Sequence, residues 1–221
     1  EGGSPGEFSP GQYVSVSVTL PDGLQQRRQY SLSDAPQAAH WRITVKAEAA
    51  DETKPAGQVS NWLHANVKAG DRLLVSAPYG EFTTSLDEAR PLVLLSAGVG
   101  ITPMMSMVAA LAAKGSRREI LFAHAARHGS HVALRRHLTF AATQLPNLRV
   151  ATFFETPQSH EREGADYSYA GRMDISRLTL PANADYLLCG PVPFMQTQWR
   201  ALRDAGVPAE RLHREVFGPD A

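Results

Sequence analysis

The stretch Pro91-Leu-Val-Leu-Leu-Ser96-Ala-Gly98-Val-Gly100-Ile-Thr102-Pro103-Met-Met-Ser106 decides the fold of this chain. Its apolar run, residues 92–95, is typical of a strand that is buried on both faces. Two glycines then allow a sharp turn and a close approach of the backbone to a ligand. Thr102 is predicted to cap a helix that has Pro103 at its first position and ends at Gly115.

A strand, a glycine turn and a helix N-terminus together form a cradle of free N–H groups that suits a phosphate. The pattern differs from the dinucleotide fingerprint of dehydrogenases, which has a third glycine where Pro103 stands here. Any αβ unit can begin with Gly-x-Gly, so the motif alone does not separate a nucleotide site from an ordinary structural turn.

The composition excludes several classes of protein. The 221 residues, 43% hydrophobic and 20% charged, are enough for one large or two small globular domains. Basic and acidic residues number 22 each, so no surplus of positive charge points to nucleic acid or an anionic membrane. There is no apolar run of transmembrane length and no signal-peptide pattern, and Cys189 is the single cysteine; together these predict a cytoplasmic protein.

The first half of the chain has the patterns of an antiparallel β unit. Valines alternate with polar residues along 12–20, and the turn residues Pro21-Asp-Gly23 follow. Further strands are predicted at 27–32, 41–46 and 71–77. Short strands separated by turn residues predict a small antiparallel β-barrel.

Two polar groups of residues interrupt this β pattern. Gly57-Gln58-Val59-Ser60 predicts a glycine turn, a serine N-cap and a short helix, which is either a plug for the barrel or a second anion cradle. In Arg28-Gln29-Tyr30-Ser31 the guanidinium suits a phosphate, the phenol suits an aromatic ring and the hydroxyl suits a ring nitrogen. The alternative is an exposed edge strand with ordinary polar residues.

From residue 89 onward, strand and helix patterns alternate. Strands are predicted at 92–96, 119–124, 148–154, 185–189 and 211–217, and helices at 102–114, 132–145, 174–178 and 192–205. This alternation predicts a parallel sheet with right-handed crossovers, in which ligands bind at the carboxyl ends of the strands. The glycine turn and the stretch Cys189-Gly190-Pro191 both lie at such ends.

Cys189 has two interpretations, a small buried side chain or a thiol that faces a bound ring. A nucleophile is not predicted, because the sequence places no base or acid to activate it. The histidines, among them His124, His128 and His131, have no spacing that indicates a metal site, so no metal is predicted.

Taken together and in this order, the motifs resemble the ferredoxin–NADP reductase superfamily. The residues of these motifs are most similar to those in the reductase part of flavohaemoglobins, the bacterial and fungal nitric oxide dioxygenases. This similarity extends over nearly the whole chain. The matching motifs are Pro10-Gly-Gln-Tyr13, Arg28-Gln-Tyr-Ser-Leu32, Gly57-Gln-Val-Ser-Asn-Trp-Leu-His64, Ser96-Ala-Gly-Val-Gly-Ile-Thr-Pro-Met104, His124-Ala-Ala126, Cys189-Gly-Pro-Val192 and Glu215-Val-Phe-Gly-Pro219. The resemblance implies an FAD-binding antiparallel β-barrel in residues 1–88 and an NAD(P)-binding α/β domain in residues 89–221.

The resemblance also implies roles for the matching residues. Arg28 would contact the FAD phosphates, and Tyr30 and Ser31 the isoalloxazine. Tyr30, Ser31, Cys189 and Glu215 would lie nearest the reacting rings, with Glu215 influencing the flavin potential and the electron path to haem. The implied FAD-binding residues are Tyr13, Arg28, Gln29, Tyr30, Ser31, Gly57, Gln58, Val59, Ser60, Val216, Phe217, Gly218 and Pro219. Those implied for NADH or NADPH are Gly98, Val99, Gly100, Ile101, Thr102, Pro103, Cys189, Gly190 and Pro191.

The implied activity is electron transfer from NAD(P)H through FAD to the haem of an N-terminal globin domain in the same polypeptide. That haem would convert nitric oxide and oxygen to nitrate. The family's globin domain and first barrel strand are both missing here, and no Met starts the sequence, so we expect a segment of a longer chain. The linker 47–56 is also longer than the family leads us to expect.

Two alternatives stay open. One is a reductase that feeds an iron–sulfur protein or an oxygenase, and the other is a non-catalytic subunit that senses FAD or NAD. The choice between NADH and NADPH is open as well. Arg127, just beyond a predicted strand, is the candidate to meet a 2′-phosphate.

Overall fold

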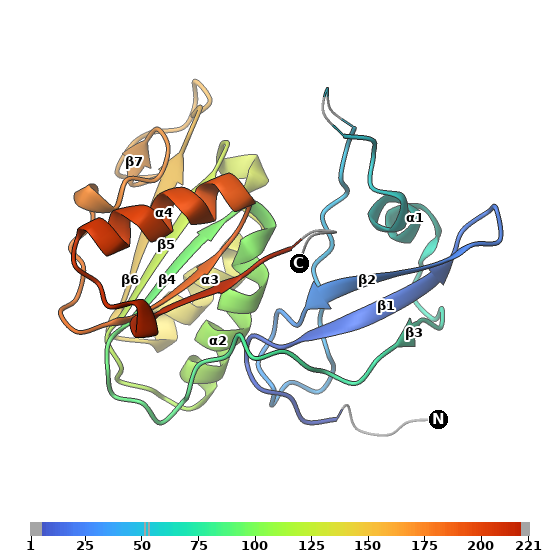
Figure 1. Ribbon diagram of the computed structural model, residues 1–221, viewed down its shortest axis with the longest axis horizontal. Helices are drawn as coiled ribbons and strands as arrows, with labels where there is room; N and C mark the ends of the chain where they lie inside the picture. Colours follow the sequence, from blue (N-terminus) through green and yellow to red (C-terminus); the bar gives the residue numbers. More distant parts are fainter. Residues whose placement is uncertain (1–5, 51, 53, 218–221) are drawn as a thin grey trace.

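The computed structural model describes residues 6–50, 52 and 54–217, and it places two sheets side by side (Figure 1). The first is an antiparallel sheet in the order β2-β1-β3, formed by β1 (Tyr13–Thr19), β2 (Gln25–Ser31) and β3 (Leu74–Val75). Helix α1 (Gln58–Asn66) lies against this sheet. The antiparallel class is confirmed, and within the described residues it is a three-stranded sheet and not a closed barrel.

Alternation of apolar side chains explains the first hairpin. Val14, Val16 and Val18 of β1 are buried together with Val59 and Leu63 of α1. The polar positions between them face the other side of the strand, as the period of two requires.

The predicted strand at 41–46 is wrong. Only one antiparallel bridge forms there, between Ile43 and Leu32. Trp41, Ile43 and Val45 do pack against the core of the first sheet, so the alternation correctly reported burial. A ladder also needs a neighbouring strand in register, and the alternation of one segment contains no information about that.

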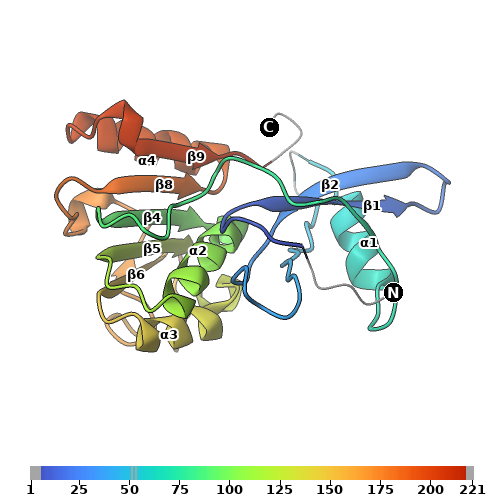
Figure 2. The same ribbon diagram turned by 90° about the horizontal axis from the view of Figure 1, so that it is seen from below.

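The second sheet is parallel and has the order β7-β6-β5-β4-β8-β9. Helices α2 and α3 cover one face and α4 covers the other (Figure 2). Its strands are β4 (Leu92–Ala97), β5 (Ile120–Ala126), β6 (Leu148–Phe154), β7 (Tyr169–Ala170), β8 (Asp185–Cys189) and β9 (Leu212–Glu215). Its helices are α2 (Ile101–Ala113), α3 (Arg135–Gln144) and α4 (Val192–Asp204), with 3₁₀ turns η1 (Gly98–Gly100), η2 (Gly129–His131), η3 (Ile175–Arg177) and η4 (Ala209–Arg211).

The start of α2 differs from the prediction. Thr102 is not the N-cap, because Gly98–Gly100 already winds into a 3₁₀ turn and the helix begins at Ile101. The Thr102 hydroxyl instead donates to the carbonyl oxygen of Val99, at 3.0 Å. The predicted end is confirmed, since Gly115 has φ +67° and its N–H closes the last turn.

The same early start occurs in α1. Gly57, not Ser60, is the N-cap, and the Ser60 hydroxyl lies inside the first turn, where it donates to the Gly57 carbonyl oxygen at 3.3 Å. In both helices a glycine is the N-cap, Gly57 in α1 and Gly100 in α2, so Ser60 and Thr102 lie inside the first turn and cannot be the caps.

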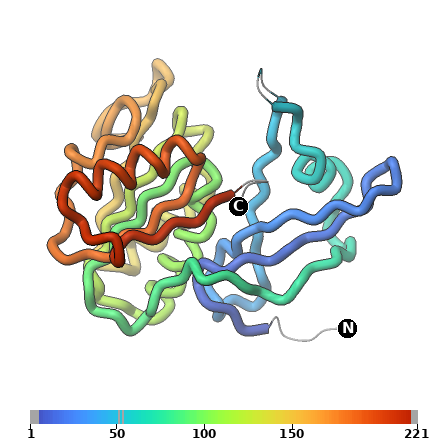
Figure 3. The backbone as a smooth tube through the Cα atoms, in the orientation of Figure 1, coloured from blue at the N-terminus to red at the C-terminus, as the bar shows by residue number. Residues whose placement is uncertain are grey.

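The last described residues connect the two halves. After β9 the chain runs from the parallel sheet toward the antiparallel one (Figure 3). Among the helices of the described residues, none combines the length and the apolar character needed to cross a membrane.

Candidate functional site

The glycine turn after β4 packs directly on the end of β8. Gly98 has φ +53°, a backbone conformation that residues other than glycine rarely adopt. A Cβ added to Gly100 would lie 2.1 Å from the carbonyl oxygen of Cys189 and 2.8 Å from the amide nitrogen of Gly190. The structure therefore brings together two motifs that are about 90 positions apart, Gly98–Gly100 and Cys189–Gly190, at the carboxyl edge of the sheet.

A cavity of about 1020 Å³ opens at this edge and has walls from both halves of the chain. Gly98, Val99 and Pro191, all predicted from the sequence, line it. Most of the other lining residues were not predicted as site residues from the sequence. They lie at or just after the ends of β4, β5 or β7, in the first turns of α4, or in the loop beyond Ile43. These include Thr44, Val45, Lys46, Ala47, Glu48, Ala97, Ala125, Ala126, Ser130, His131, Arg172, Phe194 and Thr197.

Basic side chains gather on the rim of this cavity. Lys46 comes from the first half, and Arg127, His131 and Arg172 come from the second. Burial lowers the pKa of His131, and the nearby His128, Arg127 and Lys46 lower it further. Glu48 and Glu155 line the same cavity and pair with Lys46 at 2.8 Å and with Arg172 at 2.7 Å, so Arg127 is the side chain on this rim that best suits a phosphate.

The start of α2 has the properties of a phosphate cradle. Its first three residues, Ile101, Thr102 and Pro103, are buried, and the N-terminus of a helix leaves backbone N–H groups without partners inside the helix. Nothing lies within 4 Å of a Cβ added to Gly98, so a ligand has room to approach the backbone there, whereas the space beside Gly100 is filled by the Cys189 backbone. These residues fit the pyrophosphate of a nicotinamide dinucleotide.

A second group of predicted residues lies on β2. The Ser31 side chain is 4% exposed, and its hydroxyl has no hydrogen-bond partner among the described residues. A buried hydroxyl without a partner is costly, so this atom fits a ligand that supplies an acceptor or donor. Tyr30 is half-buried, and burial raises the pKa of its phenol while Arg28 partly offsets that rise.

Tyr13 stands opposite Ser31 in the hairpin register. Its ring meets Tyr79 edge to face at 5.0 Å, and its hydroxyl accepts from the Gln29 amide at 3.3 Å. Arg28 is exposed, and one arm of its guanidinium donates to the Arg27 carbonyl oxygen at 2.7 Å. The β1–β2 hairpin therefore presents the rings of Tyr13 and Tyr30, the Arg28 guanidinium and the unpaired Ser31 hydroxyl, a set that fits a flavin nucleotide.

The turn before α1 is equally tight. A Cβ on Gly57 would lie 2.6 Å from the Ser60 hydroxyl oxygen, so no side chain fits there without a shift. Because the Ser60 hydroxyl is occupied inside the turn, the groups left for an anion are the backbone N–H groups of Gln58 and Val59.

Glu215 connects the two groups of residues. It stands opposite Cys189 in the β8–β9 register, and burial raises the pKa of its carboxyl group. Burial raises the pKa of Tyr13 in the first half, and the negative charge of Glu215 raises it further. Burial and Glu215 together raise the pKa of the Cys189 thiol well above its usual value, so this thiol is neutral and unsuited to nucleophilic attack.

The remaining predicted residues lie at the end of the chain. Val216 packs against the buried apolar side chains between the parallel sheet and α4, whereas Phe217 packs against those between the sheet and α2. Gly218 and Pro219 lie outside the described residues. In the part of the chain that the structure describes, no group of three or more histidine, cysteine or acidic side chains is placed to hold a metal ion.

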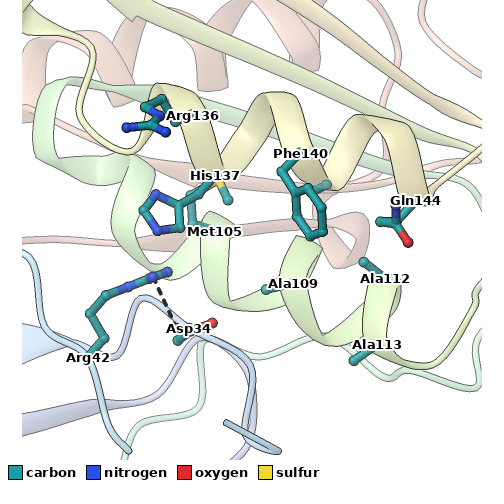
Figure 4. A pocket seen from close by; sticks show the side chains of 11 residues that line it. Asp34, Arg42, Met105, Ala109, Ala112, Ala113, Arg136, His137, Phe140 and Gln144 are labelled. Carbon is teal, nitrogen blue, oxygen red and sulfur yellow. Dashed lines mark ion pairs between the residues drawn. The ribbon is translucent and has the colours of Figure 1, made fainter.

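A second hollow, of about 680 Å³, lies between α2, α3 and the loop after β2 (Figure 4). Ala109 and Phe140 face each other across it, and an ion pair of 3.1 Å between Arg42 and Asp34 forms one end. None of the predicted site residues lines this hollow.

Two family models match consecutive parts of the chain. The model described as oxidoreductase FAD-binding domain matches residues 6–84, and the one described as oxidoreductase NAD-binding domain matches residues 94–199. The order and placement agree with the antiparallel and parallel sheets.

Curated relatives align with nearly the whole chain. The flavohemoprotein of Bordetella pertussis is 49% identical over 99% of this chain, and that of Chromobacterium violaceum is 48% identical over 99%. The chain spans about half the length of these curated relatives, 55% in both cases.

Solved structures agree. The flavohem-like FAD/NAD-binding domain of nitric oxide dioxygenase from Vibrio cholerae has a TM-score of 0.88 and 33% identity, with 99% of this chain and 89% of that chain covered. The flavohemoglobin of Malassezia yamatoensis, solved with bound FAD and heme, has a TM-score of 0.82 and 32% identity, with 99% and 54% covered.

Proposed function

The chain belongs to the flavohaemoglobin-type oxidoreductases with an FAD-binding and an NAD-binding domain, and on that premise we propose that it supplies electrons for nitric oxide dioxygenation. The donor is NADH or NADPH, the electron carrier is FAD, and the acceptor is the haem of a globin domain that precedes this segment in the whole protein. When bound, the two cofactors supply the chemistry: the nicotinamide gives two electrons as a hydride, and the flavin returns them singly.

The observation that carries this proposal is the unpaired Ser31 hydroxyl. It is buried on the strand that also carries Arg28 and Tyr30, in the half that matches an FAD-binding domain. We assign Ser31 to hold the flavin ring by a hydrogen bond, Tyr30 and Tyr13 to pack against it, and Arg28 to bind its phosphates. Gln29 orients the Tyr13 hydroxyl.

The helix starts divide the two pyrophosphates between them. Backbone N–H groups within Gly57–Ser60 would bind the FAD pyrophosphate, and those within Gly98–Thr102 the nicotinamide one. Gly57 itself donates to the Glu48 carbonyl oxygen, and Pro103 has no N–H and would contribute only by shape. We assign Cys189, Gly190 and Pro191 to the wall beside the nicotinamide ring, because Gly100 packs on the backbone of Cys189 and Gly190, and Pro191 lines the larger cavity.

The C-terminal residues complete the proposed site. Glu215 is the one charged group that acts electrostatically on both Tyr13 and Cys189, so we assign it to tune the flavin potential. Val216 and Phe217 would cover the flavin. No side chain needs to act as an acid or base in the hydride step, which agrees with the absence of a catalytic dyad among these assignments.

The partner and the location rest on the relatives. Proteins called flavohemoprotein are almost twice the length of this chain, and the Malassezia protein carries both FAD and heme. We therefore propose an N-terminal globin domain as electron acceptor, a division of this chain near residue 88, and a cytoplasmic location that suits its one buried cysteine.

Two preparations test the proposal. The present chain, loaded with FAD, should catalyse NADH- or NADPH-dependent reduction of ferricyanide, which needs no haem. The whole gene product should consume nitric oxide in the presence of oxygen and nicotinamide. If the chain reduces ferricyanide but its gene encodes no globin domain, the reductase assignment would stand and the assignment to nitric oxide dioxygenation would be refuted.

A further inference from the structure

Helix α2 carries a buried hydroxyl that crosses to the other half of the chain. Ser106 is fully buried, and it lies on a stretch of helix whose neighbours Met104, Met105, Met107 and Val108 are all buried and apolar. Its Oγ donates to the backbone carbonyl oxygen of Asp34, at 2.8 Å. A serine inside a helix often bonds back to its own helix, but this one bonds to a residue 72 positions away.

The acceptor is held firmly in the first half of the chain. Asp34 follows the flavin-side strand β2 by three residues, and its carboxylate pairs with Arg42 at 3.1 Å. The same guanidinium donates to the Ser33 carbonyl oxygen at 2.6 Å, and the Ser33 N–H donates to the Arg42 carbonyl oxygen at 2.8 Å. The carbonyl that Ser106 reaches is therefore part of a rigid loop.

The next residue of α2, Met107, makes a van der Waals contact with the first half of the chain. A Cβ on Gly11 would lie 2.5 Å from the terminal methyl carbon of Met107 and 2.1 Å from the Phe82 carbonyl oxygen. Gly11 immediately precedes the segment that enters β1. Two consecutive residues of α2 thus touch the loops that flank both strands of the hairpin.

The N-terminus of α2, where the nicotinamide nucleotide would bind, is also fixed. The helix continues without a break from the glycine turn Gly98–Gly100, which rests on the Cys189 carbonyl. A shift or rotation of α2 relative to the loop after β2 would therefore move the nucleotide cradle relative to Ser31. The Met107 contact limits how closely the halves approach, whereas a hydrogen bond is directional and also limits rotation.

We propose that Ser106 is a positioning residue that fixes the nicotinamide cradle relative to the flavin strand by its hydrogen bond to Asp34. This inference rests on the proposed reductase function. Hydride transfer is sensitive to the separation and alignment of the reacting groups, and an error of about 1 Å costs roughly 100-fold in rate. A hydroxyl that sets the relation between the two cofactor sites acts on this step without touching either ring.

The test compares Ser106→Ala with a matched variant, Val108→Ala, which removes buried atoms from the same helix two residues later. Flavin reduction is followed by stopped flow at saturating NADH or NADPH. We expect Ser106→Ala to lower the reduction rate constant about tenfold, with Kd values for FAD and nucleotide within about twofold of native. Val108→Ala should lose stability but keep the native rate within about twofold.

A distance measurement on the protein without cofactors supplies an independent readout. Spin labels on Leu24→Cys in the first half and Arg200→Cys in the second occupy exposed positions, and the native Cys189 is buried. We expect a narrow distance distribution in the labelled protein with native α2 and in its Val108→Ala variant. In the Ser106→Ala variant the distribution should be broadened or shifted.

An unchanged distance distribution in Ser106→Ala, or a reduction rate within about twofold of native, would overturn the proposal. Failure of the native protein to be reduced by either nucleotide would instead refute the reductase function, and the spin-label distances would still decide whether Ser106 fixes the two halves. The Arg42→Gln variant, which loosens the Asp34 loop from the other side, should shift the distances in the same direction as Ser106→Ala.

Discussion

Gly100 lies so close to Cys189 that a Cβ on the glycine would stand 2.1 Å from the cysteine carbonyl oxygen. The obstacle is backbone in the middle of a parallel sheet, where β4 and β8 are paired through Ser96 and Cys189. Neither partner can retreat as a flexible side chain would. The glycine turn and the end of β8 are thus one rigid unit.

Gly100→Ala should therefore be strongly destabilising. We expect a loss of about 2–4 kcal/mol in the free energy of unfolding, because overpacking against backbone forces the sheet edge to move. Urea unfolding measures this loss. Gly115→Ala is the control: that site also meets an unfavourable φ, +67°, but nothing lies within 4 Å, so only about 1 kcal/mol should be lost. Equal losses in the two variants would contradict the close-packing account.

Ser31→Ala should separate folding from flavin binding. The hydroxyl is buried without a partner, so its removal should leave the cofactor-free protein as stable as native or about 1 kcal/mol more stable. The same change should weaken FAD binding about tenfold, as expected for one lost hydrogen bond. Fluorescence titration with FAD and urea unfolding provide the two readouts. Ser17→Ala, on the neighbouring strand, should alter FAD affinity by less than about twofold, and an equal effect there would refute the assignment.

His124 should make stability depend on pH. Burial lowers the pKa of its imidazole to about 4, from 6.5 in the unfolded chain, and its Nδ1 bonds to the Ser96 hydroxyl at 2.8 Å. Because the unfolded chain binds the proton first, the stability from neutral His124 is complete above pH 6.5 and is lost as the pH falls toward 4. The shift corresponds to about 3 kcal/mol at most.

The measurement compares native protein with His124→Gln by urea unfolding at a series of pH values. Buried carboxylates contribute equally to both proteins, so the difference between the two curves isolates the imidazole. The native curve should fall more steeply than the variant curve on acidification. Parallel curves would show that His124 is not a buried neutral imidazole.

Arg127 should influence the choice of nucleotide. It lies on the rim of the larger cavity, close to His131, where a 2′-phosphate would meet a guanidinium. Arg127→Ala should raise the KM for NADPH about tenfold and change the KM for NADH by less than about twofold. The ratio of the two KM values is the quantity to measure; if it does not change, the arginine is a solvated side chain. Arg200→Ala, on the exposed surface of α4, is the matched control.

Cys189 should be unreactive in the folded protein. Its thiol is fully buried, and burial with the nearby Glu215 charge raises its pKa, so little thiolate forms near neutral pH. Iodoacetamide should modify it only after denaturation. Rapid modification of the native protein would contradict the placement of this side chain at the buried end of β8.

The sequence predicted the parts of the fold that depend on local pattern. The buried run before Gly98, the helix end at Gly115 and the alternation of strands and helices after residue 89 all have local physical causes. The strand at 41–46 failed because pairing depends on a neighbour, and Ile43 finds only Leu32. The predicted caps at Thr102 and Ser60 were wrong because each helix begins earlier, α2 after the 3₁₀ turn Gly98–Gly100 and α1 directly after Gly57.

The candidate site could be predicted only in part for a related reason. The motifs placed Gly100 and Cys189 at the carboxyl ends of two strands, but they did not show that these strands are neighbours or that the two backbones touch. The Ser106 bond to Asp34 and the wall formed by Thr44–Ala50 depend on how the two sheets pack, which no single motif contains. Pairing across 72 residues is a tertiary property.

The central claim is that this chain binds FAD in its first half and reduces it with a nicotinamide bound in its second half. The most direct measurement is the absorption spectrum of the FAD-loaded protein under anaerobic conditions, before and after addition of NADH or NADPH. We predict a yellow protein that bleaches with at least one of the two nucleotides and recovers its colour when oxygen is admitted. A protein that takes up no FAD, or that holds FAD and stays yellow with both nucleotides, would contradict the account.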